Sequence, residues 1–151
     1  MFNKIILAIV ALIGLSAVLA QQQDGGVPPF LSGAPADVIQ SFGALLQANA
    51  HKPEKEIDAA VEGWAGKQSA AIQGKFKEFK TQLSKMNGDA EAAHTAAVSK
   101  FSPEAKAADT KLAAIAANPA LSPNQKGEQI ETLMKGLPEK VRSEIEKAMQ
   151  G

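Results

Sequence analysis

The chain of 151 residues contains no cysteine and no tyrosine, and it has a single tryptophan. Without cysteine the protein can form no disulfide framework, no thiol nucleophile and no zinc ribbon. The 16 Lys and Arg residues balance the 16 Asp and Glu residues, so the formal net charge is zero. Because a dedicated nucleic-acid-binding protein is usually clearly basic, we expect no nucleic-acid partner. The length corresponds to one domain.

Catalytic motifs are also missing from the sequence. The two histidines, His51 and His94, are not accompanied by a Gly-x-Ser-x-Gly elbow. Nucleophilic hydrolysis would require a serine beside a histidine that an acid orients. His51 lies in a turn just before Pro53, and His94 lies in an alanine-rich stretch, so surface or interhelical hydrogen bonding explains both. We therefore predict that the protein is not an enzyme.

The first 20 residues have the features of a secretory signal peptide. Lys4 precedes an apolar stretch over residues 5–18, and the small residues Val18 and Ala20 occupy the −3 and −1 positions of a cleavage site. The apolar stretch is shorter than the roughly 20 residues that a membrane-spanning helix needs. We predict cleavage after Ala20, a secreted, extracellular protein, and no transmembrane span in the mature chain.

The remaining sequence predicts an all-α protein. Residues 21–34 are rich in Gln, Gly and Pro, and we interpret them as a flexible N-terminal lead. Residues 35–150 then repeat one pattern, in which a helix-starting residue is followed by an apolar stripe and a stop signal. No segment alternates apolar and polar residues as a strand would. We expect a single domain of about six to seven short helices, packed as antiparallel helical hairpins.

The expected helix boundaries rest on proline at helix starts and on Asn-Gly or Gly at helix ends. The clearest stripe belongs to the third helix, and Asn87-Gly88 is predicted to end it, so that Asp89 caps a fourth. The apolar residues of the third helix recur at helical spacing. They are Ile72, Phe76, Phe79, Leu83 and Met86. The other helices are predicted to open at Pro35, Pro53, Ser102-Pro103, Ser122-Pro123 and Leu137-Pro138.

Acidic residues provide the candidate metal ligands. Asp58 and Glu62 are four residues apart on the second helix and therefore share a face. Asp89 and Glu91, which follow the expected turn, form a second candidate pair. No EF-hand loop is present. Gly88 does not stand at the sixth position that such a loop requires, and the glutamate at the twelfth position is absent. A structural interpretation also explains the acids of the second helix, because they complement the helix dipole near its N-terminus.

The third helix is basic, and this suggests two further interpretations. An acidic helix followed by a basic one favours mutual complementarity when the two pack antiparallel. Alternatively, the basic face binds anionic lipid or an acidic partner, although its apolar stripe is better used in the core. The lysines concerned are Lys67, Lys75, Lys77, Lys80 and Lys85.

Several segments of the chain are similar to one known family. Taken in order, the segments that carry the likeness are Pro28-Pro29-Phe30-Leu31-Ser32-Gly33-Ala34-Pro35, which leads into Val38 and Phe42, then Glu56-Ile57-Asp58 with Val61, Trp64-Ala65 and Lys67-Gln68. Together they resemble the SXP/RAL family of nematode secreted antigens, several of which are allergens. The resemblance covers about residues 28–145. It implies a secreted, all-helical antigen with a domain described as cation-binding and with no enzymatic activity.

Our first hypothesis is therefore a secreted, non-catalytic antigen that needs no cofactor and binds a divalent cation (Mg or Ca) weakly. Asp58 and Glu62 would supply oxygen ligands, with Asp89 and Glu91 as the second candidate pair. One alternative is a carrier of small hydrophobic ligands such as a fatty acid or a retinoid, in a cavity between alanine-lined helices beside Phe76, Phe79 and Met86. Another is an interaction module that uses the Lys-rich third helix against a host or worm surface component. The sequence does not identify the physiological partner.

Overall fold

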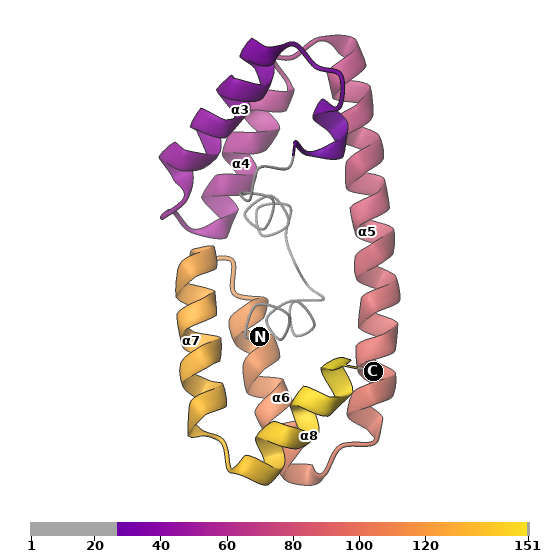
Figure 1. Ribbon diagram of the computed structural model, residues 1–151, viewed down its shortest axis with the longest axis vertical. Helices are drawn as coiled ribbons and strands as arrows, with labels where there is room; N and C mark the ends of the chain where they lie inside the picture. Colours follow the sequence, from indigo (N-terminus) through magenta and orange to yellow (C-terminus); the bar gives the residue numbers. More distant parts are fainter. Residues whose placement is uncertain (1–26, 151) are drawn as a thin grey trace. The chain divides into compact units, whose positions relative to one another are not determined.

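The structure is a computed structural model, and it describes residues 27–150, with side chains up to residue 148. The predicted signal peptide, its cleavage site and the first part of the lead lie outside the described residues. The described chain forms one short 3-10 helix and six α-helices (Figure 1). Their bounds are η2 Pro29–Leu31, α3 Ala36–Asn49, α4 Glu54–Ala65, α5 Ala70–Ser99, α6 Pro103–Ala116, α7 Pro123–Gly136 and α8 Glu139–Gln150.

The predicted all-α class is confirmed. Residues 27–150 contain no strand, and α3 and α4 lie side by side as a helical hairpin joined by residues 50–53 (Figure 1). Two contacting helices with so short a connection must run antiparallel, as expected. None of the described helices combines the length and the apolar character that crossing a membrane requires.

Helix α5 corrects the predicted boundary between the third and fourth helices. We expected Asn87-Gly88 to end one helix and Asp89 to cap the next, but α5 continues from Ala70 to Ser99 without a break. Gly33 is the only residue with positive φ among those described, so Gly88 does not adopt the left-handed conformation of a helix C-cap. Glycine inside a helix costs about 1 kcal/mol relative to alanine, and α5 tolerates this cost.

The contacts of the described chain group into two compact units, and each has its own core. We call residues 27–85 with 119–123 the N-terminal unit, and residues 86–118 with 124–150 the C-terminal unit. The boundary between Lys85 and Met86 falls inside α5. The two halves of this helix therefore have different surroundings.

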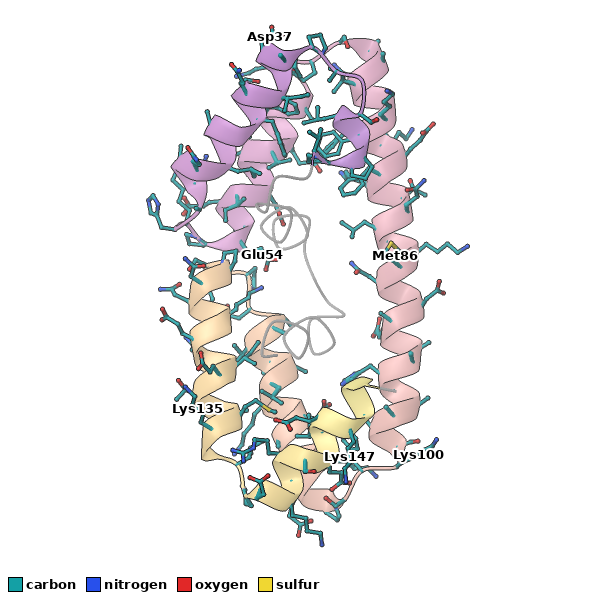
Figure 2. The ribbon with its side chains drawn as sticks, viewed as in Figure 1. Asp37, Glu54, Met86, Lys100, Lys135 and Lys147 are labelled. Carbon is teal, nitrogen blue, oxygen red and sulfur yellow. The ribbon has the colours of Figure 1, made fainter. Side chains whose placement is uncertain are left out.

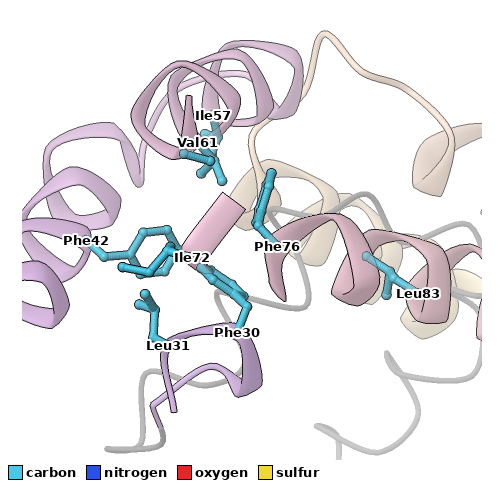
Figure 3. Packing of buried hydrophobic residues seen from close by; sticks show 9 residues of the cluster. Phe30, Leu31, Phe42, Ile57, Val61, Ile72, Phe76 and Leu83 are labelled. Atoms are coloured by element: carbon cyan, nitrogen blue, oxygen red, sulfur yellow. The ribbon is translucent and has the colours of Figure 1, made fainter. Parts of the chain in front are cut away.

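The core of the N-terminal unit is built around Phe30 (Figure 3). The Phe30 ring centroid lies 5.4 Å from that of Phe42, 5.2 Å from that of Phe76 and 5.2 Å from that of Phe79. Aromatic pairs at such separations are favourable beyond the area that they bury. The buried residues of this core are Phe30, Leu31, Phe42, Ile57, Val61, Ala65, Ile72, Phe76 and Leu83.

The position of Phe30 also corrects the predicted extent of the flexible lead. Phe30 and Leu31 belong to the segment 21–34 that we expected to be flexible, yet both are fully buried in the 3-10 helix η2. Pro29 begins this turn, and the Ser32 and Ala34 N–H groups donate to the carbonyls of Pro29 and Leu31. The apolar pair Phe30-Leu31 has enough area to hold the segment against α3 and α5.

The loop at residues 119–123 completes the start of α4 in the same unit. The Glu54 N–H donates to the Leu121 carbonyl at 3.0 Å, and the Lys55 N–H donates to the Pro119 carbonyl at 3.3 Å. The first N–H groups of a helix have no partner within the helix, so these carbonyls act as its cap. Pro53 itself stands one residue before α4, at the capping position rather than inside the helix.

The C-terminal unit packs α6, α7 and α8 around small and aliphatic residues. Its helix α6 starts as predicted, with Pro103 in the first turn and the Ser102 hydroxyl accepting the Ala105 N–H at 3.2 Å. Alanines at the helix contacts allow close approach and leave little room for larger side chains. The buried apolar residues are Ala105, Ala108, Leu112, Ala116, Ile130, Met134, Val141 and Ile145.

Candidate functional site

The first candidate pair, Asp58 and Glu62, lies along one side of α4. Asp58 is half-buried and Glu62 is exposed, one helical turn apart. Side chains with this spacing are neighbours on a helix surface, as the sequence predicts. Two carboxylates in this arrangement offer at most four oxygen atoms to a cation.

Glu62 is held by a lysine of the neighbouring helix within the N-terminal unit. Lys80 Nζ of α5 forms an ion pair with Glu62 Oε1, and the same ammonium group lies 5.8 Å from the centroid of the Phe76 ring. Both charged side chains of the pair are about half exposed, so the pair contributes modestly to stability. The expected complementarity of the acidic and basic helices is therefore present, and a cation at Glu62 has to compete with this ammonium group.

The second candidate pair, Asp89 and Glu91, is not brought together in the same way. Both side chains are exposed in the middle of α5, because the expected turn at Asn87-Gly88 is helical. Residues two apart on a helix point about 200° away from each other, at roughly 100° per residue. The two carboxylates therefore face different sides of α5 instead of converging.

The described residues do not fit a preformed metal centre. Between residues 27 and 148, no group of three or more His, Asp or Glu side chains is placed to share a metal ion. Calcium takes six to eight oxygen ligands, and magnesium usually keeps several waters beside one or two carboxylates. Any cation at Asp58 and Glu62 would accordingly remain largely hydrated.

Two of the lysines on the basic helix have partners inside the protein. Lys75 Nζ donates to the Ser32 carbonyl at 2.9 Å, and Lys80 pairs with Glu62. Both side chains run along the edges of the apolar stripe of α5, where a lysine can cover apolar surface with its stem. These contacts favour the interpretation in which the lysines of the basic helix pair with groups of the protein itself, rather than with anionic lipid or an acidic partner.

His94 makes an interhelical hydrogen bond, which is one of the two roles that we predicted for it. Its Nε2 atom lies 2.8 Å from Oδ1 of Asp109, so the contact joins α5 to α6 in the C-terminal unit. Asp109 is buried, at 7% exposure, and a buried carboxylate requires such a partner. The partner of His94 is thus an acid that ties two helices together, while His51 is exposed in the turn before α4.

A polar cluster that the sequence analysis missed joins α6 to α8. Oε1 of Glu144 accepts the Ser102 backbone N–H at 2.6 Å, and Oε2 accepts the Ser102 hydroxyl at 2.8 Å. These two hydrogen bonds, the backbone one first, lower the pKa of Glu144, and nearby Lys140 adds to the effect. Ser102 was recognisable as a helix cap, but no local signal connects it to a residue 42 positions away.

These features define an all-α protein with exposed acids and lysines, and among the described residues no group of three or more His, Asp or Glu side chains converges to hold a metal ion. The chain belongs to the SXP/RAL-2 family. It matches over residues 1–150 the family described as SXP/RAL-2 family protein Ani s 5-like, metal-binding domain, in agreement with the resemblance seen in the sequence.

Two curated relatives are similar over most of their length. The OV-17 antigen of Onchocerca volvulus is 39% identical over 123 residues, which cover 82% of this chain and 75% of the relative. The SXP/RAL-2 family protein Ani s 5 of Anisakis simplex is 37% identical over 122 residues, which cover 81% of this chain and 80% of the relative. No solved structure matches the chain. The protein is therefore a homologue of nematode antigens.

Proposed function

We propose that this protein is an exported, non-catalytic helical antigen that associates weakly with divalent cations such as calcium or magnesium. Its family is described as having a metal-binding domain, and its relative OV-17 is named an antigen. The signal-peptide features of residues 1–20 support export. The buried acid partner of His94 supports a structural rather than a catalytic use of that histidine.

The acidic pair on α4 carries the cation part of the proposal. Asp58 and Glu62 share one side of the helix, and together they provide two carboxylates to a cation that keeps most of its water. A site with so few protein ligands has a dissociation constant on the order of millimolar, as in the weakest extracellular calcium modules. The Lys80 ammonium group weakens cation binding further, because it forms an ion pair with Glu62 when no cation is bound.

Isothermal titration calorimetry with calcium and with magnesium tests this proposal. The unmodified protein is expected to bind with a dissociation constant on the order of millimolar. Lys80→Gln removes the competing ammonium group and should tighten binding several-fold. Lys77→Gln is the matched control, because it removes the same charge from an exposed position on the same helix. The double variant Asp58→Asn/Glu62→Gln should lose the binding.

Two results would contradict the proposal at different points. Micromolar binding would require a converging ligand set and would contradict the weak, hydrated mode of association. Unchanged binding in the Asp58→Asn/Glu62→Gln variant would instead contradict the location on α4. Heat equal to that of buffer at millimolar ion would remove the cation claim while leaving the family assignment intact.

The hydrophobic-carrier alternative receives less support from the packing. It requires an apolar cavity beside Phe76 and Phe79, and both of these rings contact Phe30 in the core of the N-terminal unit. Met86, the third residue expected at that cavity, is 65% exposed on α5 (Figure 2). We therefore retain the cation-associating antigen as the proposed function.

A further inference from the structure

The middle of α5 differs from the rest of this helix in having no buried side. Of the ten residues from Ser84 to Ala93, only Asn87 is half-buried, and the other nine are exposed. Met86 is 65% exposed (Figure 2). Within the preceding turns, by contrast, Ile72, Phe76 and Leu83 are buried in the core of the N-terminal unit. This middle segment of α5, residues 84–93, is helical without the support of a packed face.

The same segment contains three consecutive poor helix formers, Asn87, Gly88 and Asp89. Gly88 costs about 1 kcal/mol relative to alanine in a helix interior, and Asn87 and Asp89 are also poor helix formers. Most helix stability in proteins comes from packing of an apolar face, and short unsupported helices are marginal in water. The middle segment places these three residues in an exposed stretch without a packed face, so it should be the interior part of α5 that opens at the lowest free energy.

Opening of this segment leaves both hydrophobic cores intact. The boundary between the two units falls between Lys85 and Met86, and residues 84–93 contribute no side chain to either core. Local unwinding of this short stretch therefore exposes no buried apolar side chain. A protease, which binds its substrate as an extended strand, can capture a stretch that opens in this way.

We propose that the middle segment of α5 is a proteolytic processing site, cut after Lys85 by serine proteases whose acidic pocket accepts a lysine side chain. One water molecule hydrolyses the Lys85–Met86 peptide bond, which leaves a carboxylate on Lys85 and a free amino group on Met86. Lys85 is exposed, lies within residues 84–93 and stands two positions before the weak helix formers Asn87, Gly88 and Asp89. The proposal is independent of cation binding, because Asp58 and Glu62 lie on α4.

The turns on either side of α5 carry exposed lysines as well, but hydrogen bonds hold these turns closed. Next to Lys67, Gln73 Nε2 donates to the carbonyls of Gly66 and Gln68 at 3.1 and 2.8 Å. The turn that contains Lys100 ends at Ser102, whose N–H and hydroxyl are bound by Glu144. Extending either turn into a protease would break these contacts, so cleavage after Lys85 is expected first.

Limited digestion of the purified protein with trypsin, under native conditions and with mass spectrometry of the earliest products, tests the proposal. The first products should be a fragment that ends at Lys85 and one that begins at Met86. Gly88→Ala should slow this cut about fivefold, the factor that corresponds to the helix preference of alanine over glycine. A side chain at Gly88 meets no atom within 4 Å, so the substitution adds helix propensity without a clash.

Gly74→Ala is the matched control for this experiment. Gly74 is also exposed on α5 with open space for a side chain, but it lies beside the buried residues Ile72 and Phe76. If cleavage follows opening of the middle segment alone, Gly74→Ala should leave the rate of the Lys85 cut unchanged. First cuts after Lys67 or Lys100, with the Lys85–Met86 bond still intact in those fragments, would overturn the proposal. Equal slowing by Gly74→Ala and Gly88→Ala would overturn it too, because the cut would then follow global unfolding.

Discussion

At the scale of single residues, a few polar contacts join helices of the protein, and the two residues of each contact are distant in the sequence. Glu144 on α8 accepts both donors of Ser102 at the start of α6, and Asp109 on α6 contacts His94 on α5. The sequence predicted the helix-capping role of Ser102 and the hydrogen-bonding role of His94. It could not identify Glu144 or Asp109 as their partners, because local spacing carries no information about which faces meet.

We predict that Glu144→Gln reduces stability in a pH-dependent manner. The hydrogen bonds from Ser102 lower the pKa of Glu144 in the folded protein, below the value of about 4.3 expected in the unfolded chain. The stabilising contribution is therefore complete above about pH 4.3 and is lost as the pH falls through the lower folded value. Urea unfolding of both proteins between about pH 3 and 7 should show a difference that shrinks at acidic pH. A difference that is constant over this range would contradict the prediction.

Asp109→Ala is expected to destabilise the protein by about 1–3 kcal/mol, because it removes a buried carboxylate and leaves the His94 ring without this partner. Urea or thermal unfolding monitored by circular dichroism measures the change. Glu131→Ala provides the comparison, because it breaks an exposed ion pair with Lys135 on α7 and should cost no more than about 0.5 kcal/mol. Similar losses in the two variants would show that the Asp109 contact is as weak as a surface pair.

At the scale of elements, apolar periodicity predicted which face of a helix is buried more reliably than where the helix ends. Ile72, Phe76 and Leu83 are buried on α5 as their spacing indicates, but Met86, at the end of the same stripe, is exposed. The stripe continues in the sequence beyond the point where the N-terminal unit provides a surface to cover it. The Asn87-Gly88 stop signal failed for a related reason, because a glycine that keeps negative φ remains compatible with a helix.

The short helix η2 lies in a segment that we predicted to be flexible. Its buried residue Phe30 also provides a direct test of the core. Phe30→Ala should destabilise the protein by about 3–5 kcal/mol, because the ring contacts Phe42, Phe76 and Phe79 and its removal leaves a cavity. Val27→Ala, at a position that is 47% exposed, should change stability by less than about 0.5 kcal/mol. Denaturant unfolding compares the two variants, and a loss below about 1 kcal/mol for Phe30→Ala would contradict the central place of this ring.

At the scale of the whole molecule, the sequence predicted the class of the fold but not its division into two units. Helix starters and the absence of strand patterns were enough for the all-α assignment. Residues 119–123 belong to the N-terminal unit, and the carbonyls of Pro119 and Leu121 accept hydrogen bonds from the N–H groups of Lys55 and Glu54. The sequence does not show which backbone N–H groups make such contacts. Long-range pairing of this kind cannot be derived from local composition.

The candidate site shows the same limit. Helical spacing placed Asp58 and Glu62 on one side of α4, and the expected match of the acidic and basic helices is present as the Glu62–Lys80 pair. The carboxylates of Asp89 and Glu91 do not converge, because the segment that contains them is helical and the two side chains face different sides of the helix. Because the described residues offer no third acid or histidine to either pair, we predict that any cation association is weak and confined to α4.

The most direct test of this account is a titration of the isotope-labelled protein with calcium or magnesium, followed by NMR of the backbone amides. We expect small shifts that are centred on Asp58 and Glu62, extend to Lys80 and do not saturate below millimolar ion. Saturation at micromolar ion, or large shifts spread over a different set of helices, would mean that an organised metal centre exists elsewhere in the chain and would contradict the account.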